Sequence, residues 1–128
     1  MKQRIFSGID LVEIQRFRDL NPLILNRFFE RVFTPAEITY INGSFSRAAG
    51  IFAAKEAAVK ALGSGIGPIR WHDVEIDRTV EKQPLLKLHG PAQERARKMC
   101  ISEWSISITH TKSTAAAVAI AAVISSTK

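Results

Sequence analysis

Two carboxylates, Asp10 and Glu56, are the residues of this 128-residue chain most able to do chemistry. At about 100° per residue, Glu56 in "FAAKEAAVKALGSGIG" (52–67) falls inside the apolar sector of a helix, about 40° from Phe52. A carboxylate that faces inward needs a partner, because burying an unpaired charge costs several kcal/mol or more. The partner is a lysine, a metal ion or a bound ligand.

Each acid also has a purely structural interpretation. Asp10 ends an apolar strand at 4–12, and with Glu13 it matches a D-x-x-E capping box. Glu56 and Lys60 form an i,i+4 pair in the favourable orientation. Taken together, two carboxylates without a thiolate or histidine cluster are typical of a hard ion that prefers oxygen, such as Mg²⁺. Such a site leaves coordination positions for substrate phosphates.

The segment "GSGIG" at 63–67 follows the same helix. Glycines let a backbone come close to a ligand, and their amides can meet phosphate oxygens. The segment follows a helix rather than leading into one, so it is not a P-loop. Glycine spacing alone favours a helix C-cap and a turn.

His110 and a group of arginines are ambiguous in the same way. His110 ends an alternating strand, where a lone histidine is more often structural than a base. The early helices carry arginines that form either a solvated face or an electropositive docking face for an acidic protein: Arg16, Arg18, Arg27 and Arg31.

Length and charge limit the possible functions. At 128 residues, positions 1–128 are expected to form one domain. The formal charge of +6, from 18 Lys and Arg against 12 Asp and Glu, suits an anionic partner such as nucleic acid, a phosphorylated cofactor or an acidic protein. The absence of repeated basic–aromatic interleaving argues against a platform for single-stranded nucleic acid.

The chain is expected to be cytoplasmic. Its one cysteine, Cys100, cannot form an internal disulfide and points to a reducing compartment. No apolar run reaches the roughly 18 to 20 residues that span a bilayer, so we expect no membrane contact. The N-terminus "MKQRIFSGID" lacks the apolar region of a signal peptide.

Hydrophobic spacing predicts an α+β fold, with N-terminal helices packed on an antiparallel sheet. Thr34, Pro35 and Glu37 give a full helix start signal, and Gly63 is placed to end the long helix, on which Lys55 and Lys60 flank the apolar sector. Expected helices lie at 12–20, 23–33, 34–41, 44–62 and 91–100. Expected strands lie at 4–12, 69–76, 84–90, 104–110 and 115–124, with a polar turn at 77–83.

Four segments together resemble the holo-acyl-carrier-protein synthases, small 4′-phosphopantetheinyl transferases of bacterial fatty-acid synthesis. They are "GIDLVEI", "RVFTPAEI", "FAAKEAAVKALGSGIG" and "SISITHTKSTAAAVAI", in this order. The resemblance runs from about Phe6 to Val123. It implies the family's fold and its reaction, in which the phosphopantetheine arm of coenzyme A moves to a serine of apo acyl carrier protein and adenosine 3′,5′-bisphosphate leaves.

The resemblance also implies roles for particular residues. Asp10 and Glu56 match the family's Mg²⁺ ligands, and Lys60 matches a lysine that holds the phosphate or the leaving oxygen. The base is metal-bound water, Glu56 or His110. Coenzyme A binding is implied for Lys60, Gly63, Gly65, Gly67, His110 and Thr111, and carrier-protein docking for Arg16 and Arg27. Family members are homotrimers with active sites between subunits.

One departure and two alternatives stay open at this point. Many members carry an arginine where this chain has Ile51, which leaves the adenine-nucleotide end of the site undefined. An enzyme of the same family serving a polyketide or peptide synthetase carrier is one alternative. A small basic nucleic-acid-binding module is the other, although it does not explain Asp10 or the inward Glu56.

Overall fold

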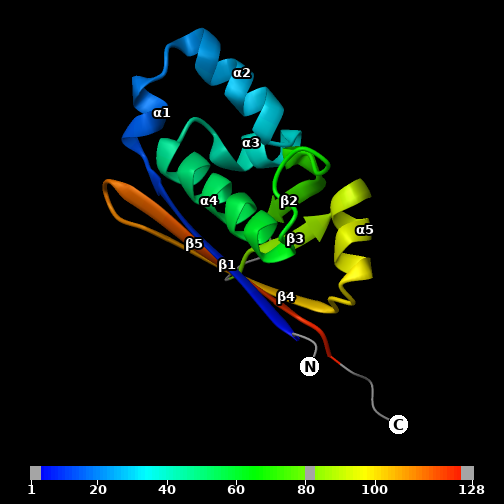
Figure 1. Ribbon diagram of the computed structural model, residues 1–128. Coiled ribbons are helices and arrows are strands. Elements are labelled where there is room, and N and C mark those ends of the chain that lie inside the picture. The colour runs from blue at the N-terminus through cyan, green and yellow to red at the C-terminus, as the bar shows by residue number, and fades with distance from the viewer. Residues whose placement is uncertain (1–3, 80–82, 125–128) are drawn as a thin grey trace.

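The computed structural model describes residues 4–79 and 83–124 (Figure 1). Its helices are α1 (Gln15–Asp19), α2 (Pro22–Val32), α3 (Pro35–Ile41), α4 (Phe45–Leu62) and α5 (Gly90–Lys98), with a short 3₁₀ helix at Trp71–Asp73. Its strands are β1 (Ile5–Glu13), β2 (Val74–Asp77), β3 (Leu85–Leu88), β4 (Glu103–His110) and β5 (Thr114–Ala122). The α+β prediction is confirmed.

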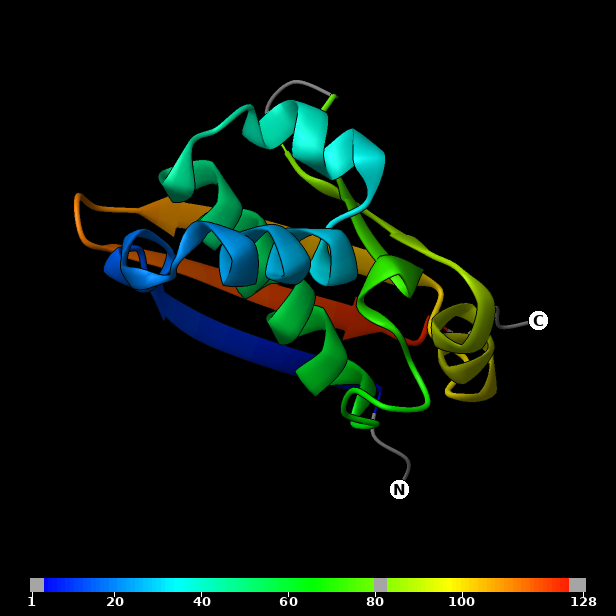
Figure 2. The same ribbon diagram turned by 90° about the horizontal axis from the view of Figure 1, so that it is seen from above.

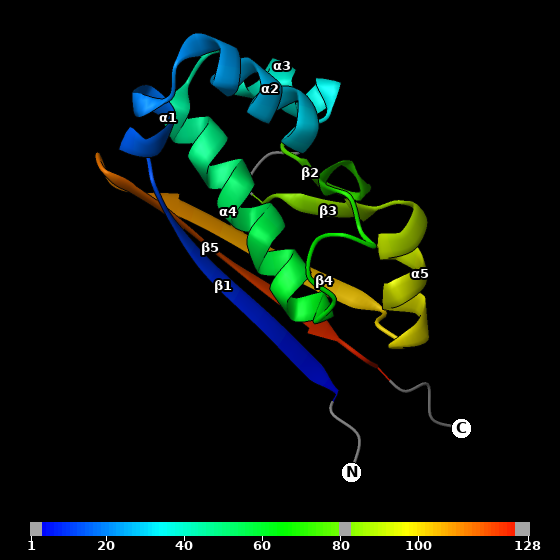
Figure 3. The same ribbon diagram turned by 45° about the horizontal axis from the view of Figure 1, so that its top comes forward.

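The strands form an antiparallel three-stranded sheet in the order β1–β5–β4 and a separate β2–β3 hairpin. All helices lie on one face of the three-stranded sheet, and α4 lies between it and the layer of α1, α2 and α3 (Figure 3). Seen from above, α1 and α2 lie over the sheet on the side of α4 (Figure 2). No helix in the described part of the chain is long and apolar enough to cross a membrane.

Small residues let α4 lie close against the sheet. Thirteen of its 18 residues are buried, and the face of β5 beneath it consists of alanines. At Gly8 on β1, an added Cβ would lie 1.9 Å from the carbonyl oxygen of Ala57, so only glycine permits this approach. This contact brings β1 residues directly under α4.

The helix boundaries follow the predicted caps. Thr34 and Glu37 form the expected capping box of α3, with the Glu37 amide donating to Thr34 Oγ1 and the Thr34 amide to Glu37 Oε1. The Ser44 hydroxyl caps the start of α4, and Gly63 ends it in the left-handed conformation. The C-cap interpretation of Gly63 is therefore confirmed.

Two local predictions are wrong. Asp10 does not end its strand or cap a helix, because β1 continues through Glu13 and α1 begins without a side-chain cap. The strand predicted at 69–76 begins only at Val74, because the Asp73 carboxylate accepts the Arg70 amide and folds the preceding residues into a 3₁₀ turn. The polar turn predicted at 77–83 includes residues 80–82, which lie outside the described part.

The face of the sheet opposite α4 carries apolar side chains. Strand alternation puts Ile9 and Leu11 of β1 there, 65% and 68% exposed, beside Val118 and Ile120 of β5. No helix or strand within residues 4–79 and 83–124 covers this face (Figures 1 and 3). We call Ile9, Leu11, Val118 and Ile120 the outer face. The apolar strand predicted at 4–12 is therefore covered on one face only.

Candidate functional site

Asp10, Glu56 and Lys60 meet where α4 crosses β1. Asp10 points to the covered side of the sheet, and its side chain is only 14% exposed. The Lys60 ammonium donates to Asp10 Oδ1 at 2.9 Å and to the Ile9 carbonyl oxygen at 3.0 Å. The lysine predicted to pair with Glu56 along the helix thus forms its ion pair with the strand instead.

Glu56 shares a hydrogen bond with Asp10, so the two carboxyl groups predicted to act together are adjacent. Its side chain is half-buried. Burial raises the pKa of Glu56 to about 7, and the hydrogen bond and negative charge of Asp10 add to this, while Lys60 and Arg16 oppose it. Hydrogen bonding to Asp10 raises the pKa of Lys60. The site therefore holds two acids that repel each other when both are ionised.

This donor set fits a hard divalent cation in part. Adjacent carboxylates supply the oxygen ligands that Mg²⁺ prefers, and a cation between them would relieve their repulsion. No group of three or more His, Cys, Asp or Glu side chains with metal-binding geometry occurs in the described residues. The acid pair could therefore supply at most two ligands, and the rest of a coordination sphere would have to come from water and substrate oxygens.

Lys55 was predicted to lie at the border of the apolar sector, but its side chain is fully buried. Its ammonium lies 2.7 Å from Glu37 Oε1, and both side chains are completely inaccessible. Burial lowers the pKa of Lys55, against the opposing effect of Glu37. The error has a clear cause: α4 is covered on both sides, so a single apolar sector does not describe it.

The glycine segment lies one helical turn beyond Lys60. Gly63, Gly65 and Gly67 all have positive φ, and a Cβ on Gly65 or Gly67 would meet no atom within 4 Å. The segment borders a cavity of about 560 Å³, whose walls include two arginines and a tryptophan ring. Its lining residues are Arg31, Ile66, Gly67, Ile69, Arg70, Trp71 and His72. Its open backbone and basic surroundings can accept an anionic ligand.

His110 lies away from the acid pair in the same chain. It shares a sheet face with Asp10, but the two residues are on the two edge strands with β5 between them, about 10 Å apart across the sheet. Its Nδ1 lies 3.2 Å from the Thr111 carbonyl oxygen. A single chain therefore does not bring His110 and Thr111 to Asp10 and Glu56.

A second cavity, of about 160 Å³, lies beside His110. Its walls include Tyr40, Ile51, Arg47 and Arg78, and the two guanidinium groups lie 5.1 and 5.6 Å from the centre of the Tyr40 ring. Sequence reasoning singled out neither arginine. Ile51, which stands where many family members have an arginine, thus lines the same cavity as Arg47 and Arg78.

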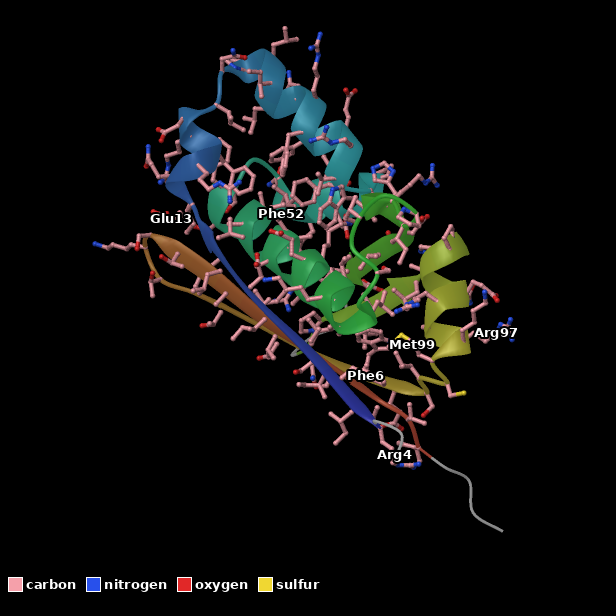
Figure 4. All side chains as sticks on the ribbon, viewed as in Figure 1. Arg4, Phe6, Glu13, Phe52, Arg97 and Met99 are labelled. Carbon is pink, nitrogen blue, oxygen red and sulfur yellow. The ribbon has the colours of Figure 1, made fainter. Side chains whose placement is uncertain are left out.

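A third cavity, of about 390 Å³, lies between α1, α2 and α4. Apolar side chains line it, and three arginines surround it: Arg16, Phe17, Leu20, Ile24, Arg27, Phe28, Arg31 and Phe52. Figure 4 shows Phe52 on the side of α4 that faces α2, where its ring lies 5.1 Å from that of Phe28. Three of the four arginines of the predicted cluster therefore border an apolar pocket, which a solvated face would not require, and Arg18 does not line it.

Sequence comparison places the chain in a family. A model of the 4′-phosphopantetheinyl transferase superfamily matches residues 7–121. A holo-acyl-carrier-protein synthase of Solidesulfovibrio magneticus is 43% identical over 88% of this chain and 94% of its own, and one of Alkaliphilus metalliredigens is 44% identical over 89% and 95%. The chain belongs to the holo-acyl-carrier-protein synthases.

Solved structures of holo-acyl-carrier-protein synthases have the same fold. The Helicobacter pylori enzyme in complex with coenzyme A is 34% identical and superposes with a TM-score of 0.80, over 91% of this chain and 99% of that one. The Neisseria meningitidis enzyme is 28% identical with a TM-score of 0.80, over 91% and 96%. Membership of the family favours the transferase prediction over the nucleic-acid-binding alternative.

The raised pKa of Glu56 predicts a pH-dependent stability in this holo-acyl-carrier-protein synthase. Its value of about 7 lies above the ordinary 4.5, so the folded state binds the proton more tightly than the unfolded chain. Without divalent metal, the free energy of unfolding should therefore fall from pH 4.5 to 7, relative to Glu56→Gln, which cannot ionise. Urea denaturation in chelator at several pH values measures this; parallel curves for the two proteins would contradict it.

Proposed function

We propose that this chain transfers the 4′-phosphopantetheine arm of coenzyme A to a serine of apo acyl carrier protein, with Asp10, Glu56 and Lys60 as its reaction centre. Adenosine 3′,5′-bisphosphate is the other product. The observation that carries the proposal is the adjacent Asp10–Glu56 pair beside the Lys60 ammonium in a member of this family. The assay is the mass of apo carrier protein after incubation with coenzyme A and Mg²⁺.

The two acids and the lysine of the centre have different tasks. Asp10 and Glu56 would hold Mg²⁺, which supplies charge neutralisation for the diphosphate and the transferring phosphorus. Lys60 keeps its proton because Asp10 hydrogen-bonds it, and its largely exposed ammonium can hold a phosphate or leaving-group oxygen. Within one chain the base that takes the serine proton is metal-bound water or Glu56. His110 lies across the sheet from the acid pair and takes that part only from a second copy.

Coenzyme A binding is assigned to Lys60, the glycines of the 63–67 segment, His110 and Thr111. Gly65 and Gly67 leave room for a ligand against the backbone, and the arginines of the adjoining cavity favour its negative charge. At the other edge of the sheet, Arg47 and Arg78 add positive charge beside His110. These groups suit a polyanionic substrate that spans more than one subunit.

Arg16 and Arg27 are assigned to carrier-protein docking. They border the apolar cavity between α1, α2 and α4, and this combination suits an amphipathic acidic helix. Arg16 also acts electrostatically on Glu56, so a carrier bound there would have its serine near the reaction centre. We assign the carrier to fatty-acid biosynthesis in the cytoplasm; an exposed unpaired Cys100 suits a reducing compartment.

We also propose that the enzyme is a homotrimer. The outer face presents Ile9 and Leu11 to solvent in the isolated chain, next to an exposed strand edge. A second copy on this face would bury these side chains. It would also allow the His110 edge of one subunit to approach the acid pair of another, as a site shared between subunits requires.

Removal of either acid should nearly abolish transfer. Asp10→Ala and Glu56→Ala should each lower turnover by about a hundredfold or more, because the charge that develops on the phosphates loses its compensation. Chelator should stop the wild-type enzyme and Mg²⁺ should restore it. Glu13→Ala, an exposed acid on the same strand, is the matched control and should keep the wild-type rate. Near-wild-type rates for both acid variants at saturating Mg²⁺ would place the reaction centre elsewhere.

Charge reversal at Arg16 of α1 or Arg27 of α2 should affect one substrate far more than the other. Arg16→Glu and Arg27→Glu should raise the KM for carrier protein much more than that for coenzyme A, because they repel an acidic docking surface. Added salt should likewise raise the wild-type KM for carrier protein. Arg97→Glu on α5 changes the net charge equally and should leave both KM values unchanged. Equal effects of Arg16→Glu on both substrates would make Arg16 structural.

The trimer should depend on the outer face. Light scattering should give about three times 14.2 kDa for the wild type, and Leu11→Glu should lower this toward the mass of one chain, because it buries a charge between copies. Leu23→Glu, a similarly exposed leucine on α2, should leave the mass unchanged. A wild-type monomer with full activity at every concentration would contradict the shared site.

A further inference from the structure

The buried Lys55–Glu37 ion pair joins three elements of the fold next to the reaction centre. Glu37 Oε1 accepts the Lys55 ammonium at 2.7 Å and the Thr34 amide at 2.8 Å, and Oε2 accepts the Ile76 amide at 2.7 Å. One carboxylate thus connects the start of α3, the middle of α4 and strand β2. Lys55 directly precedes Glu56 in the sequence.

Stability alone does not account for such a pair. Two fully buried charges lose their hydration, and replacing such a pair by apolar residues of similar volume is often neutral or stabilising. The best-attested use of buried polar groups is to fix the register of one element against another. The Lys55–Glu37 pair can therefore serve to fix the register of α4 against its neighbours.

The packing of α4 creates this requirement. Its contact with β5 consists largely of alanines on both sides, including Ala115, Ala117 and Ala119, and small side chains interdigitate little. On this side, small side chains resist rotation of α4 about its axis less than large interdigitating ones would. Rotation by about 20° would move a side-chain end 5–6 Å from the axis by about 2 Å, whereas Mg²⁺ requires near-ideal octahedral geometry.

We propose that Lys55 and Glu37 are positioning residues that fix the rotation of α4 and thereby hold Glu56 against Asp10. Consecutive helix residues project about 100° apart, so Lys55 is held on the α3–β2 side while Glu56 points toward β1. Lys60, bonded to the Ile9 carbonyl, holds the helix from the β1 side. The inference rests on the proposed function, because it assigns Asp10 and Glu56 to a divalent cation.

The test is direct binding of Mn²⁺, measured by calorimetry and electron paramagnetic resonance on the folded protein without substrates. Lys55→Met/Glu37→Gln should raise the Kd for Mn²⁺ about tenfold or more, as loss of groups that orient metal ligands does. Its transfer rate should fall at fixed Mg²⁺ and recover at higher Mg²⁺, with the KM for carrier protein unchanged. Lys55→Met alone, which leaves Glu37 its two amide donors, serves if the double variant does not fold.

The matched control is Arg97→Met/Glu94→Gln, which removes an exposed ion pair from α5 and should leave the Kd unchanged. A folded Lys55 variant with the wild-type Kd would overturn the inference, whatever its melting temperature, because the pair would then be structural only. Asp10→Asn separates the two hypotheses. If Asp10→Asn weakens Mn²⁺ binding and the Lys55 variants do not, only the positioning role fails; if Asp10→Asn also binds as the wild type does, both fail.

Discussion

The close contact between α4 and the three-stranded sheet is the constraint on which the rest of the structure depends. Gly8 is the point of closest approach, where the carbonyl of Ala57 occupies the space of a Cβ. Because β1 comes so near, a carboxylate two residues further along the strand reaches a carboxylate on the helix, and Lys60 reaches the strand backbone. The candidate reaction centre is thus a product of helix–sheet packing rather than of a loop.

The same contact separates the charges of α4 into two kinds. Lys55 points to the interior, where the Glu37 carboxylate pairs with it and no water reaches. Glu56 and Lys60 point to the partly open side, where their charges are only partly compensated. The Lys55–Glu37 pair neutralises its own charges and therefore does not attract a ligand. The adjacent Asp10 and Glu56 carboxylates repel each other, and a cation bound between them would be stabilising. The difference between scaffold and site lies in this balance.

The sequence was sufficient where local interactions decide the structure. The capping box at Thr34, the glycine after Leu62 and the alternation of 104–110 depend on near neighbours, and each is present as predicted. The adjacency of Asp10 and Glu56 was also predicted, from the combination of two carboxylates without a thiolate or histidine cluster and from the family resemblance. The alanine-rich run forms β5 although alanine favours helix, because pairing with β1 and β4 outweighs intrinsic propensity.

Where distant contacts decide, the sequence was not sufficient. Lys55 looked like a border residue because periodicity describes one buried face, and nothing local indicates that α3 and β2 cover the other. The position of Asp10 within its strand depends on β5 continuing to pair through Glu13. The sequence does not indicate that Arg47 and Arg78 lie together, because they are 31 positions apart and meet at the Tyr40 ring only in the folded chain.

Two features of the isolated chain have the same solution. Helices cover one side of the sheet, and the other side carries Ile9, Leu11 and Val118 (Figure 3). Only contact with another molecule would remove this outer face from water. His110 and the acid pair lie on opposite edges of that sheet, so a ligand that contacts both needs a neighbour as well. In the proposed homotrimer, contact between copies would cover the outer face, and the exposed edge strands β1 and β4 would let His110 of one copy approach the acid pair of another.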